Sequence, residues 1–232
     1  SLSRKDIGLD IPKVQEFSNN HSMGQGAEIL AKQTEVGRQK ADEFALRSHQ
    51  NAVKAQQEGV FDDMVVPVGI PPRFEVISKD DGPRADTSME SLSKLRAAFD
   101  RQFGICTAGN SSFLTDGAAA LLLTSWQKAS ELKLEMKAVI RDYVFRAGDA
   151  LHDMLAGPAL SIPFLLQRNN LTIDDIDVWE IHEAFASQVV SNLAYLRSDD
   201  FCCQRLGLSK PLGDIPLEKI NIWGGSLSIG HP

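Results

Sequence analysis

Segments typical of strands and segments typical of helices alternate after residue 86, and few folds accommodate such a pattern. Short apolar runs predict strands, whereas apolar residues spaced three and four apart predict helices. The predicted strands are 104–112, 137–145, 177–182 and 219–223, and the predicted helices are 91–99, 116–126, 158–167 and 184–196. This alternation predicts an α/β domain in which helices cover a largely central sheet.

The first part of the chain is organised differently. Its predicted elements are, in order, a helix over 27–32, a long helix over 38–58, and strands over 64–68 and 74–77. The long helix is amphipathic, because small and apolar residues such as Phe44 recur at helical spacing between charged residues. The charged, turn-rich stretch 80–86 predicts a boundary. We therefore divide the chain into two domains, residues 1–85 and 86–232.

The composition is that of a globular protein with an acidic balance. Of the 232 residues, 43% are hydrophobic and 24% are charged, and the formal net charge is -7. Nucleic-acid binding needs clustered lysine and arginine, so the scattered charges argue against nucleic acid as a partner. An anionic ligand can still bind through a few placed bases and backbone amides.

Three cysteines are too few for a disulfide framework, which favours a reducing compartment. No apolar run approaches the roughly 20 residues that span a bilayer. Residues 1–11 are neither a signal peptide nor an arginine-rich transit segment. Because the chain opens at Ser1 and stops where a helix is expected, we interpret it as a fragment of a longer protein, from which a targeting segment could have been removed.

The sequence Ile-His-Glu-Ala-Phe-Ala, residues 181–186, lies at the end of a predicted strand and the start of a predicted helix. In open α/β sheets ligands bind at this edge, because the strands hold the loops there rigidly. His182 and Glu183 are therefore candidate site residues. The alternative is that His182 is an ordinary residue at the helix start and Glu183 complements the helix dipole.

Two further segments are rich in small residues. The loop 224–232 contains His231 among glycines, which let a ligand approach the main chain closely. It could equally be a turn that contains a histidine. The segment 107–120 could line a ligand or pack a strand tightly against a helix, and Asp116 could cap that helix.

Taken together, these three segments resemble the signature stretches of thiolases, in the same order and at suitable separations. The stretches 22–28 and 42–48 are similar to parts of the thiolase loop domain, so the resemblance runs through nearly the whole chain. Many thiolases carry asparagine at the place of His182, in an Asn-Glu-Ala-Phe motif. The His-Glu-Ala-Phe motif resembles instead the thiolase β-subunits of fatty-acid oxidation complexes, including the trifunctional enzyme.

The resemblance implies an α/β thiolase fold, layered αβαβα, with a loop sub-domain at 1–85 and an incomplete C-terminal domain at 86–232. It implies an acyltransferase that cleaves 3-oxoacyl-CoA with CoA in fatty-acid β-oxidation. CoA is then a substrate, and no metal or redox cofactor is implied. The expected assembly is a homodimer or a dimer of dimers, with a hydratase/dehydrogenase α-subunit as a further candidate partner. The expected location is the mitochondrial matrix in a eukaryote and otherwise the cytoplasm.

The resemblance also implies roles for individual residues. His231 is similar to the histidine that polarises the nucleophile and helps hold the thioester oxyanion. His182 is similar to the residue that supplies a donor to the enolate oxygen, a contribution of about 3–4 kcal/mol to the barrier in comparable sites. Ser112 and the backbone of Ala108 correspond to contacts with the pantetheine arm. Phe113 departs from the glycine common at its place, so the pocket beside Ser112 is expected to be narrower or shifted.

Arg84 falls where a loop-domain arginine meets the nucleotide phosphate of CoA, a role that suits its planar cation. The alternative is that Arg84 pairs with nearby aspartates. Met23, Phe99 and Phe185 are similar to apolar walls of the acyl–pantetheine tunnel, although a plain core role fits each of them equally well.

In thiolases one cysteine attacks the thioester, and a second, in a Cys-x-Gly loop after Gly-His-Pro, transfers the proton. Cys106, Cys202 and Cys203 lie outside both contexts, so this fragment alone is expected to be inactive. Two alternatives stay open. The missing cysteines would fit a non-catalytic thiolase-fold subunit that serves binding or assembly. A biosynthetic acetoacetyl-CoA thiolase is the other, although His182 disfavours it.

Overall fold

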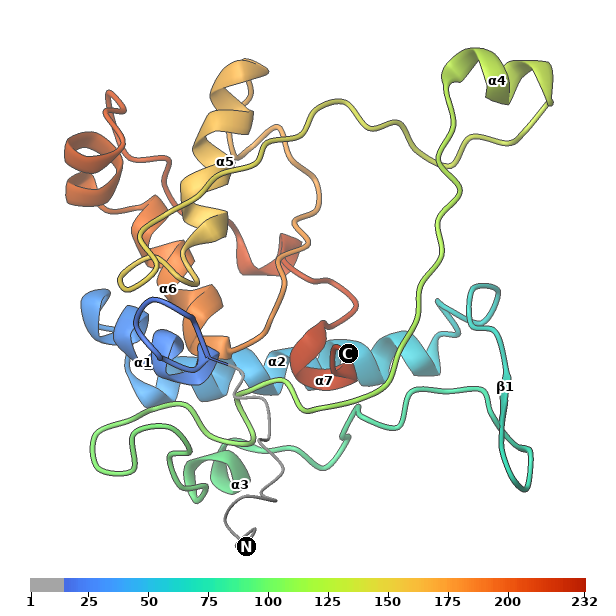
Figure 1. Ribbon diagram of the computed structural model, residues 1–232, viewed down its shortest axis with the longest axis horizontal. Coiled ribbons are helices and arrows are strands. Elements are labelled where there is room, and N and C mark those ends of the chain that lie inside the picture. Colours follow the sequence, from blue (N-terminus) through green and yellow to red (C-terminus); the bar gives the residue numbers. More distant parts are fainter. Residues whose placement is uncertain (1–14) are drawn as a thin grey trace, which may run out of the picture.

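The computed structural model describes residues 15–232, and the interpretation of residues 1–11 lies outside this range. Figure 1 shows α2 crossing the molecule close to α1, α6 and α7, with the C-terminus next to α7. The elements are α1 (Met23–Gln33), α2 (Arg38–Gln57), β1 (Val68–Ile70), β2 (Glu75–Ile77), α3 (Met89–Ser93), α4 (Trp126–Glu131), α5 (Gly157–Arg168), α6 (Ala186–Leu196), the π-helix η1 (Asp200–Arg205), the 3-10 helix η2 (Leu217–Lys219) and α7 (Ser226–Ile229).

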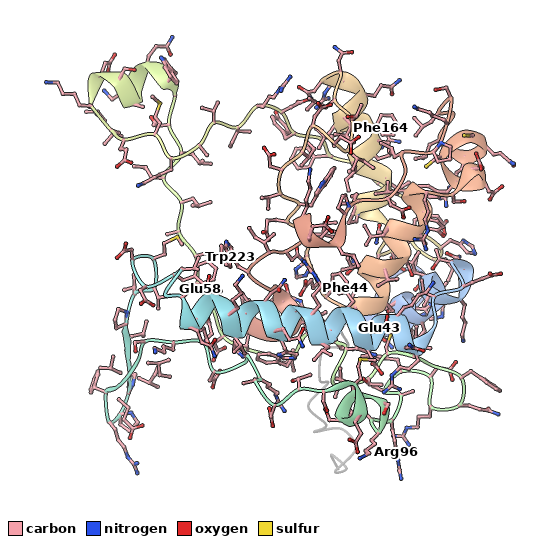
Figure 2. All side chains as sticks on the ribbon, turned by 180° about the vertical axis from the view of Figure 1, so that it is seen from behind. Glu43, Phe44, Glu58, Arg96, Phe164 and Trp223 are labelled. Atoms are coloured by element: carbon pink, nitrogen blue, oxygen red, sulfur yellow. The ribbon has the colours of Figure 1, made fainter. Side chains whose placement is uncertain are left out.

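The hydrophobic core lies between α2, α5 and α6. Phe44 of α2, Leu160 of α5 and Val189 of α6 belong to one buried cluster. Figure 2 shows Phe44 on the side of α2 that faces α5 and α6. Burying each such side chain contributes about 1.5–3 kcal/mol, which is why these three predicted helices form. Among the described residues, no helix combines the length and the hydropathy needed to cross a membrane.

Local capping explains where α1 begins. The Ser22 hydroxyl accepts a hydrogen bond from the backbone N–H of Gln25, and the Gln25 side chain accepts one from the backbone N–H of Ser22. This reciprocal pair satisfies two N–H groups that a helix start leaves without partners. As a result, α1 begins earlier than the predicted helix 27–32.

The predicted central sheet is where the structure differs most from the sequence interpretation. Among residues 15–232 the only hydrogen-bonded ladder joins β1 and β2, which run antiparallel with Val68 opposite Ile77. The strand β2 lies within the predicted strand 74–77, whereas β1 shares only Val68 with the predicted strand 64–68, which is therefore placed too early. The predicted strands 104–112 and 137–145 form no ladder.

The predicted strands 177–182 and 219–223 lie side by side but pair at a single position. Trp179 and Ile220 form a parallel bridge, supported by a 2.8 Å hydrogen bond from Asn221 N to Trp179 O. Asn221 then takes a left-handed backbone conformation, with φ 45°, so its main chain leaves the pairing. Its side chain continues the pairing instead, because Oδ1 accepts from Ile181 N and Nδ2 donates to Ile181 O, each at 2.8 Å.

Two predicted helices are wrong in extent or kind. The segment 116–126 is extended rather than helical, and its leucines are exposed, with Leu121 at 89%. An apolar stripe stabilises a helix only when it packs against a partner, and this segment runs away from the core (Figure 1). The predicted helix 91–99 is reduced to α3, which Ser88 caps at the N-terminus and which ends at Ser93.

Candidate active site

Two histidines from distant parts of the sequence meet at one place. His182 follows the Trp179–Ile220 pair, and His231 follows α7 near the C-terminus. Their imidazole centroids lie 4.6 Å apart with ring planes at 87°. Both side chains are exposed, so a ligand can reach both rings. The two histidines to which the thiolase resemblance gives roles in one reaction therefore lie side by side, and those roles stay a prediction.

A serine hydroxyl holds each imidazole at Nδ1. Ser226 Oγ lies 2.8 Å from His182 Nδ1, and Ser112 Oγ lies 2.7 Å from His231 Nδ1. With both Nδ1 atoms engaged, the two Nε2 atoms are the ring positions that can address a substrate. Ser112 was predicted to contact pantetheine, and the structure places its hydroxyl on His231.

Backbone hydrogen bonds join the segments that carry these groups. Ser112 N donates to Ala184 O at 2.9 Å, and Ala186 N donates to Asn110 O at 2.9 Å. Leu114 forms a parallel bridge with His231. The segment around Ser112 therefore lies between the two histidine-bearing segments, which explains how residues far apart in sequence form one site.

A buried carboxylate supports the site from beneath. Glu183 is fully buried and accepts hydrogen bonds from Ser48 Oγ at 2.6 Å and Asn221 Nδ2 at 2.6 Å. The backbone N–H of Leu227 in α7 donates a third, at 3.4 Å. Glu183 thus ties α2 to α7. None of these three hydrogen bonds is made with the first turn of α6, whose dipole Glu183 would complement in the alternative interpretation. Burial raises its pKa, and the hydrogen bonds from Asn221 and Ser48 oppose that shift.

The turn before α7 needs glycine at residues 224 and 225, because α2 and Glu183 leave no room for a Cβ atom there. A Cβ on Gly225 would lie 2.6 Å from Glu183 Oε2. Gly224 has φ +81°, and a Cβ there would lie 2.8 Å from the backbone oxygen of Ser48. Gly224 and Gly225 therefore serve close packing against α2 and Glu183, a role that the sequence left open.

The pKa of His182 is lowered, first by partial burial and then by the nearby His231. Burial disfavours the charged imidazolium, and a second imidazole close by adds to the effect when it is protonated. His182 is therefore neutral at neutral pH. A neutral imidazole offers one N–H donor and one acceptor nitrogen.

The predicted tunnel residues gather in one apolar group beside this site. Phe99 and Phe185 make an edge-to-face contact with ring centroids 5.7 Å apart, and Met23 packs against the buried cluster that contains Phe185 and Cys106. Phe185 is buried and serves the core, whereas Phe99 is 38% exposed and can face a ligand. The structure brings the three residues together, and their contact with a substrate stays a prediction.

Arg84 and Ala108 are both exposed. The backbone N–H of Arg84 donates to His49 Nδ1 at 3.3 Å, and within residues 15–232 its guanidinium takes part in no ion pair. The alternative pairing with nearby aspartates is thus not seen there. Gly82, two residues earlier, lies against the Phe113 ring, where a Cβ would come within 2.9 Å of Cε1, so the Arg84 loop lies beside the Ser112 segment.

The sequence interpretation missed Ser226, Ser48 and Asn221. Ser226 lies in the same glycine-rich loop as His231, and its hydroxyl group could have been recognised as a candidate hydrogen-bond partner for a site histidine. Ser48 lies in the stretch 42–48 and Asn221 in the predicted strand 219–223, but neither was given a role, because their partner Glu183 lies 135 and 38 residues away along the chain.

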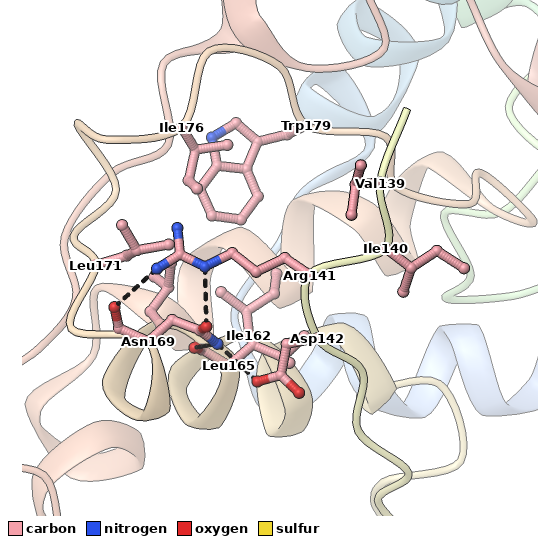
Figure 3. Close-up of a pocket in the computed structure, with 11 residues that line it drawn as sticks. Val139, Ile140, Arg141, Asp142, Ile162, Leu165, Asn169, Leu171, Ile176 and Trp179 are labelled. Atoms are coloured by element: carbon pink, nitrogen blue, oxygen red, sulfur yellow. Dashed lines mark hydrogen bonds between the residues drawn. The ribbon is translucent and has the colours of Figure 1, made fainter. Parts of the chain in front are cut away.

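A cavity of about 400 Å³ lies apart from the histidines. Figure 3 shows it between the extended segment at Val139 and Ile140, the helix α5 and Trp179, with Arg141 hydrogen-bonded to Asn169. Its walls are mainly apolar and include neither histidine, so it offers no acid–base pair. Among the described residues, no group of three or more His, Cys, Asp or Glu side chains is arranged to hold a metal ion.

Residues 3–127 match the family model of the thiolase N-terminal domain, and residues 134–232 match that of the thiolase C-terminal domain. The chain belongs to the thiolase family. This confirms the resemblance drawn from the motifs around His182, His231 and Ser112. The predicted division at residue 85 concerns a sub-domain and stays a prediction.

Curated thiolases match along the whole chain. It is 42% identical to 3-ketoacyl-CoA thiolase of Yersinia enterocolitica over 231 residues, which is 100% of this chain and 53% of that protein. It is 44% identical to the mitochondrial trifunctional enzyme subunit beta of Mus musculus over 226 residues, 97% of this chain and 47% of that protein. The chain thus spans about half the length of these thiolases.

Solved thiolase structures share the fold. Bacillus anthracis acetyl-CoA acetyltransferase superposes with a TM-score of 0.81 at 35% identity, covering 100% of this chain and 57% of that one. The dimeric peroxisomal thiolase of Saccharomyces cerevisiae superposes with a TM-score of 0.78 at 34% identity, covering 97% and 53%. The predicted α/β thiolase fold is therefore confirmed, although several expected strands form no ladder among the described residues.

The two buried cysteines, Cys106 and Cys202, lack the surroundings of a reactive thiol. Burial raises the pKa of Cys106 to about 12, and its Sγ lies 3.1 Å from Ser187 Oγ. Burial also raises the pKa of Cys202, whose Sγ lies 3.3 Å from the carbonyl oxygens of Tyr195 and Leu196. A reactive cysteine needs a lowered pKa and access to its substrate, and Cys106 and Cys202 have neither.

Proposed function

We propose that the complete protein is an acyltransferase of the 3-ketoacyl-CoA thiolase type, which cleaves 3-oxoacyl-CoA with free CoA in fatty-acid β-oxidation. The observation that carries this proposal is the pairing of His182 with His231, 4.6 Å apart and each held at Nδ1 by a serine. Support also comes from the relatives named as 3-ketoacyl-CoA thiolase and trifunctional enzyme subunit beta.

The chemistry of the cleavage explains why two imidazoles are needed. Breaking the bond between C2 and C3 leaves an enolate on the acetyl thioester, and its oxygen needs a hydrogen-bond donor. Neutral His182, with Nδ1 engaged, offers Nε2 for this purpose. His231 would polarise the attacking cysteine, which we assign to the part of the protein outside these residues. Each donor aimed at a developing oxyanion lowers the barrier by about 3–4 kcal/mol.

Histidine variants of the full-length protein test this function. We expect the wild-type protein to consume 3-oxoacyl-CoA when CoA is added. His182→Ala and His231→Ala should each reduce kcat by about 100-fold or more, the usual effect of losing one oxyanion donor. His152→Ala is the matched control, because His152 is an exposed histidine whose partner is Asp149. If both site variants kept the kcat of the wild-type protein, the proposal would be contradicted.

We propose that CoA binds with its nucleotide phosphate near Arg84 and its pantetheine arm near Ser112 and Ala108. A chain of net charge -7 repels CoA unless a local base intervenes, and the Arg84 guanidinium is exposed beside the Ser112 segment. In calorimetry on the full-length protein, Arg84→Ala should weaken CoA about tenfold and leave binding of a pantetheine fragment unchanged. Arg96→Ala, at another exposed arginine, is the control. Equal CoA affinity in both variants would exclude Arg84 from the site.

A second candidate is an acetoacetyl-CoA thiolase, because the similar solved structures include acetyl-CoA acetyltransferases. Comparing acetoacetyl-CoA with longer 3-oxoacyl-CoA substrates separates the two functions. A rate confined to acetoacetyl-CoA would favour the second candidate. A full-length protein with no turnover on either would favour a non-catalytic binding or assembly subunit.

We also propose a homo-oligomer, a dimer or a dimer of dimers, as one solved relative is described as dimeric. A hydratase/dehydrogenase α-subunit is the proposed second partner, supported by relatives named as a subunit of the trifunctional enzyme. The same names support the mitochondrial matrix as the location in a eukaryote, and the cytoplasm otherwise. CoA acts as a substrate, and the proposed reaction uses no metal or redox cofactor.

A further inference from the structure

Ser226 has a position that the family resemblance does not explain. It is the first residue of α7 and directly follows Gly224 and Gly225, which pack closely against α2 and Glu183. Its half-buried hydroxyl lies 2.8 Å from His182 Nδ1. Among the described residues, the Ser226 hydroxyl forms a hydrogen bond only with this nitrogen.

The direction of this hydrogen bond is linked to which ring nitrogen of His182 carries the proton. A neutral imidazole has one N–H and one acceptor nitrogen, and the bond made by one nitrogen sets the state of the other. If the hydroxyl donates to Nδ1, the proton must sit on Nε2. No other described acceptor competes for the hydroxyl hydrogen, so donation to Nδ1 is the arrangement that the geometry favours.

The support for Ser226 extends below the site. The Leu227 N–H, one residue on, donates to Glu183, and Glu183 directly follows His182 in the chain. The hydroxyl and the imidazole are therefore mounted on backbone segments that share one buried carboxylate. Such an arrangement holds both partners of a hydrogen bond in register.

We propose that Ser226 is a positioning residue that holds neutral His182 in the tautomer protonated at Nε2. The Nε2–H is then the donor that meets the enolate oxygen, a use that rests on the proposed thiolase function. Ser226 itself touches no reacting atom. Without its hydroxyl, His182 would divide between two tautomers, and only one of them can donate from Nε2.

The test measures the tautomer directly, in full-length protein with ¹⁵N-labelled histidine. His182→Asn identifies the signals of His182. We expect the wild-type spectrum to show Nε2–H at neutral pH, Ser226→Ala to show a mixture of tautomers, and Ser226→Thr to restore Nε2–H. In the assay, Ser226→Ala should lower kcat about tenfold with little change in KM, the effect of one neutral hydrogen bond, and Ser226→Thr should recover most of it.

The two readouts keep this proposal separate from the proposed function. An Nδ1–H tautomer in the wild-type protein, or an unchanged tautomer in Ser226→Ala, would overturn the role of Ser226 whatever the activity. Absence of turnover in the wild-type protein would contradict thiolysis and leave the spectra to decide the tautomer. A Ser226→Ala protein that fails to fold would be replaced by Ser226→Cys, whose weaker donor should give an intermediate mixture.

Discussion

His182 is the residue where partial burial and a neighbouring imidazole act in the same direction. Both lower its pKa below the ordinary value of about 6.5. In the unfolded chain His182 binds a proton at a higher pH than in the folded protein. Its contribution to stability is therefore complete above pH 6.5 and is lost as the pH falls through the folded pKa.

We expect a proton NMR titration of the full-length protein to give His182 a pKa below 6.5. His231→Asn should raise that pKa toward the ordinary value, because it removes the second cause of the shift while burial remains. A His182 pKa that does not respond to His231→Asn would show that the two rings are electrostatically independent.

Glu183 is the residue on which the packing beneath the site depends. Glu183→Ala would leave the buried donors of Ser48 and Asn221 without their acceptor, and we expect a loss of about 2–4 kcal/mol in the free energy of unfolding. Urea denaturation of the full-length protein measures this loss. Glu58→Ala is the control, because Glu58 is exposed and its ion pair with Lys54 spans 3.9 Å. Equal losses in both variants would refute the structural role of Glu183.

The raised pKa of Glu183 adds a pH dependence of known sign. The folded state binds its proton at a higher pH than the unfolded chain, so stability should fall as the pH rises from about 4.5 through the folded pKa. Glu183→Gln removes the titrating group. Its unfolding free energy should therefore lack that slope over the same pH range.

At the scale of elements, the turn into α7 is the most restrictive feature. Gly224→Ala should destabilise the protein by about 1–3 kcal/mol, because φ +81° disfavours a side chain and a Cβ would lie 2.8 Å from the backbone oxygen of Ser48. Gly157→Ala is the matched control at the start of α5, where a Cβ meets no atom within 4 Å. It should be neutral or slightly stabilising. Thermal unfolding of both variants gives the comparison.

The sequence predicts the elements whose stabilising contacts repeat locally. Helices α2, α5 and α6 were predicted because residues such as Phe44 and Val189 recur at the spacing that puts them on one face. The paired strands could not be predicted in the same way. The segment 177–182 does not pair with 219–223 beyond Trp179, because Asn221 adopts a left-handed conformation and its side-chain amide takes over the hydrogen bonds. No local sequence pattern reveals this conformation.

The candidate site was predictable in its histidines and not in their supports. His182 and His231 stand in motifs that resemble a known family, so their proximity followed from the resemblance. Ser226 and Ser112 could not be assigned to Nδ1 of the two rings, because that contact depends on how three segments cross. Long-range hydrogen bonds of this kind leave no periodic trace in a sequence.

At the scale of the whole molecule, a cluster of packed helices is joined to a long extended segment. Apart from α4, residues 115–148 form no helix or strand, and Leu121 and Phe145 are each 89% exposed. Figure 1 shows this segment passing beside α7, running out to α4 and coming back to α5, away from the packed helices.

Chymotrypsin should therefore cut the 232-residue chain first within 115–148, because a protease needs an exposed, extended backbone. Mass spectrometry of the early fragments locates the cuts. Buried aromatic sites such as Phe44 in α2 and Phe201 in η1 should survive much longer and act as internal controls. Early cleavage at Phe44 would contradict the packing described for α2.

The burial of Cys106 allows alkylation to report on the motions of the packed helices. A pKa of about 12 leaves about one thiolate in 10⁴ at pH 8, and the side chain has no exposed surface. Iodoacetamide can reach Cys106 only when the packing around Ala27 and Phe185 opens, whereas the partly exposed Cys203 reacts without such opening. The ratio of the two labelling rates therefore measures how often α1 separates from the start of α6.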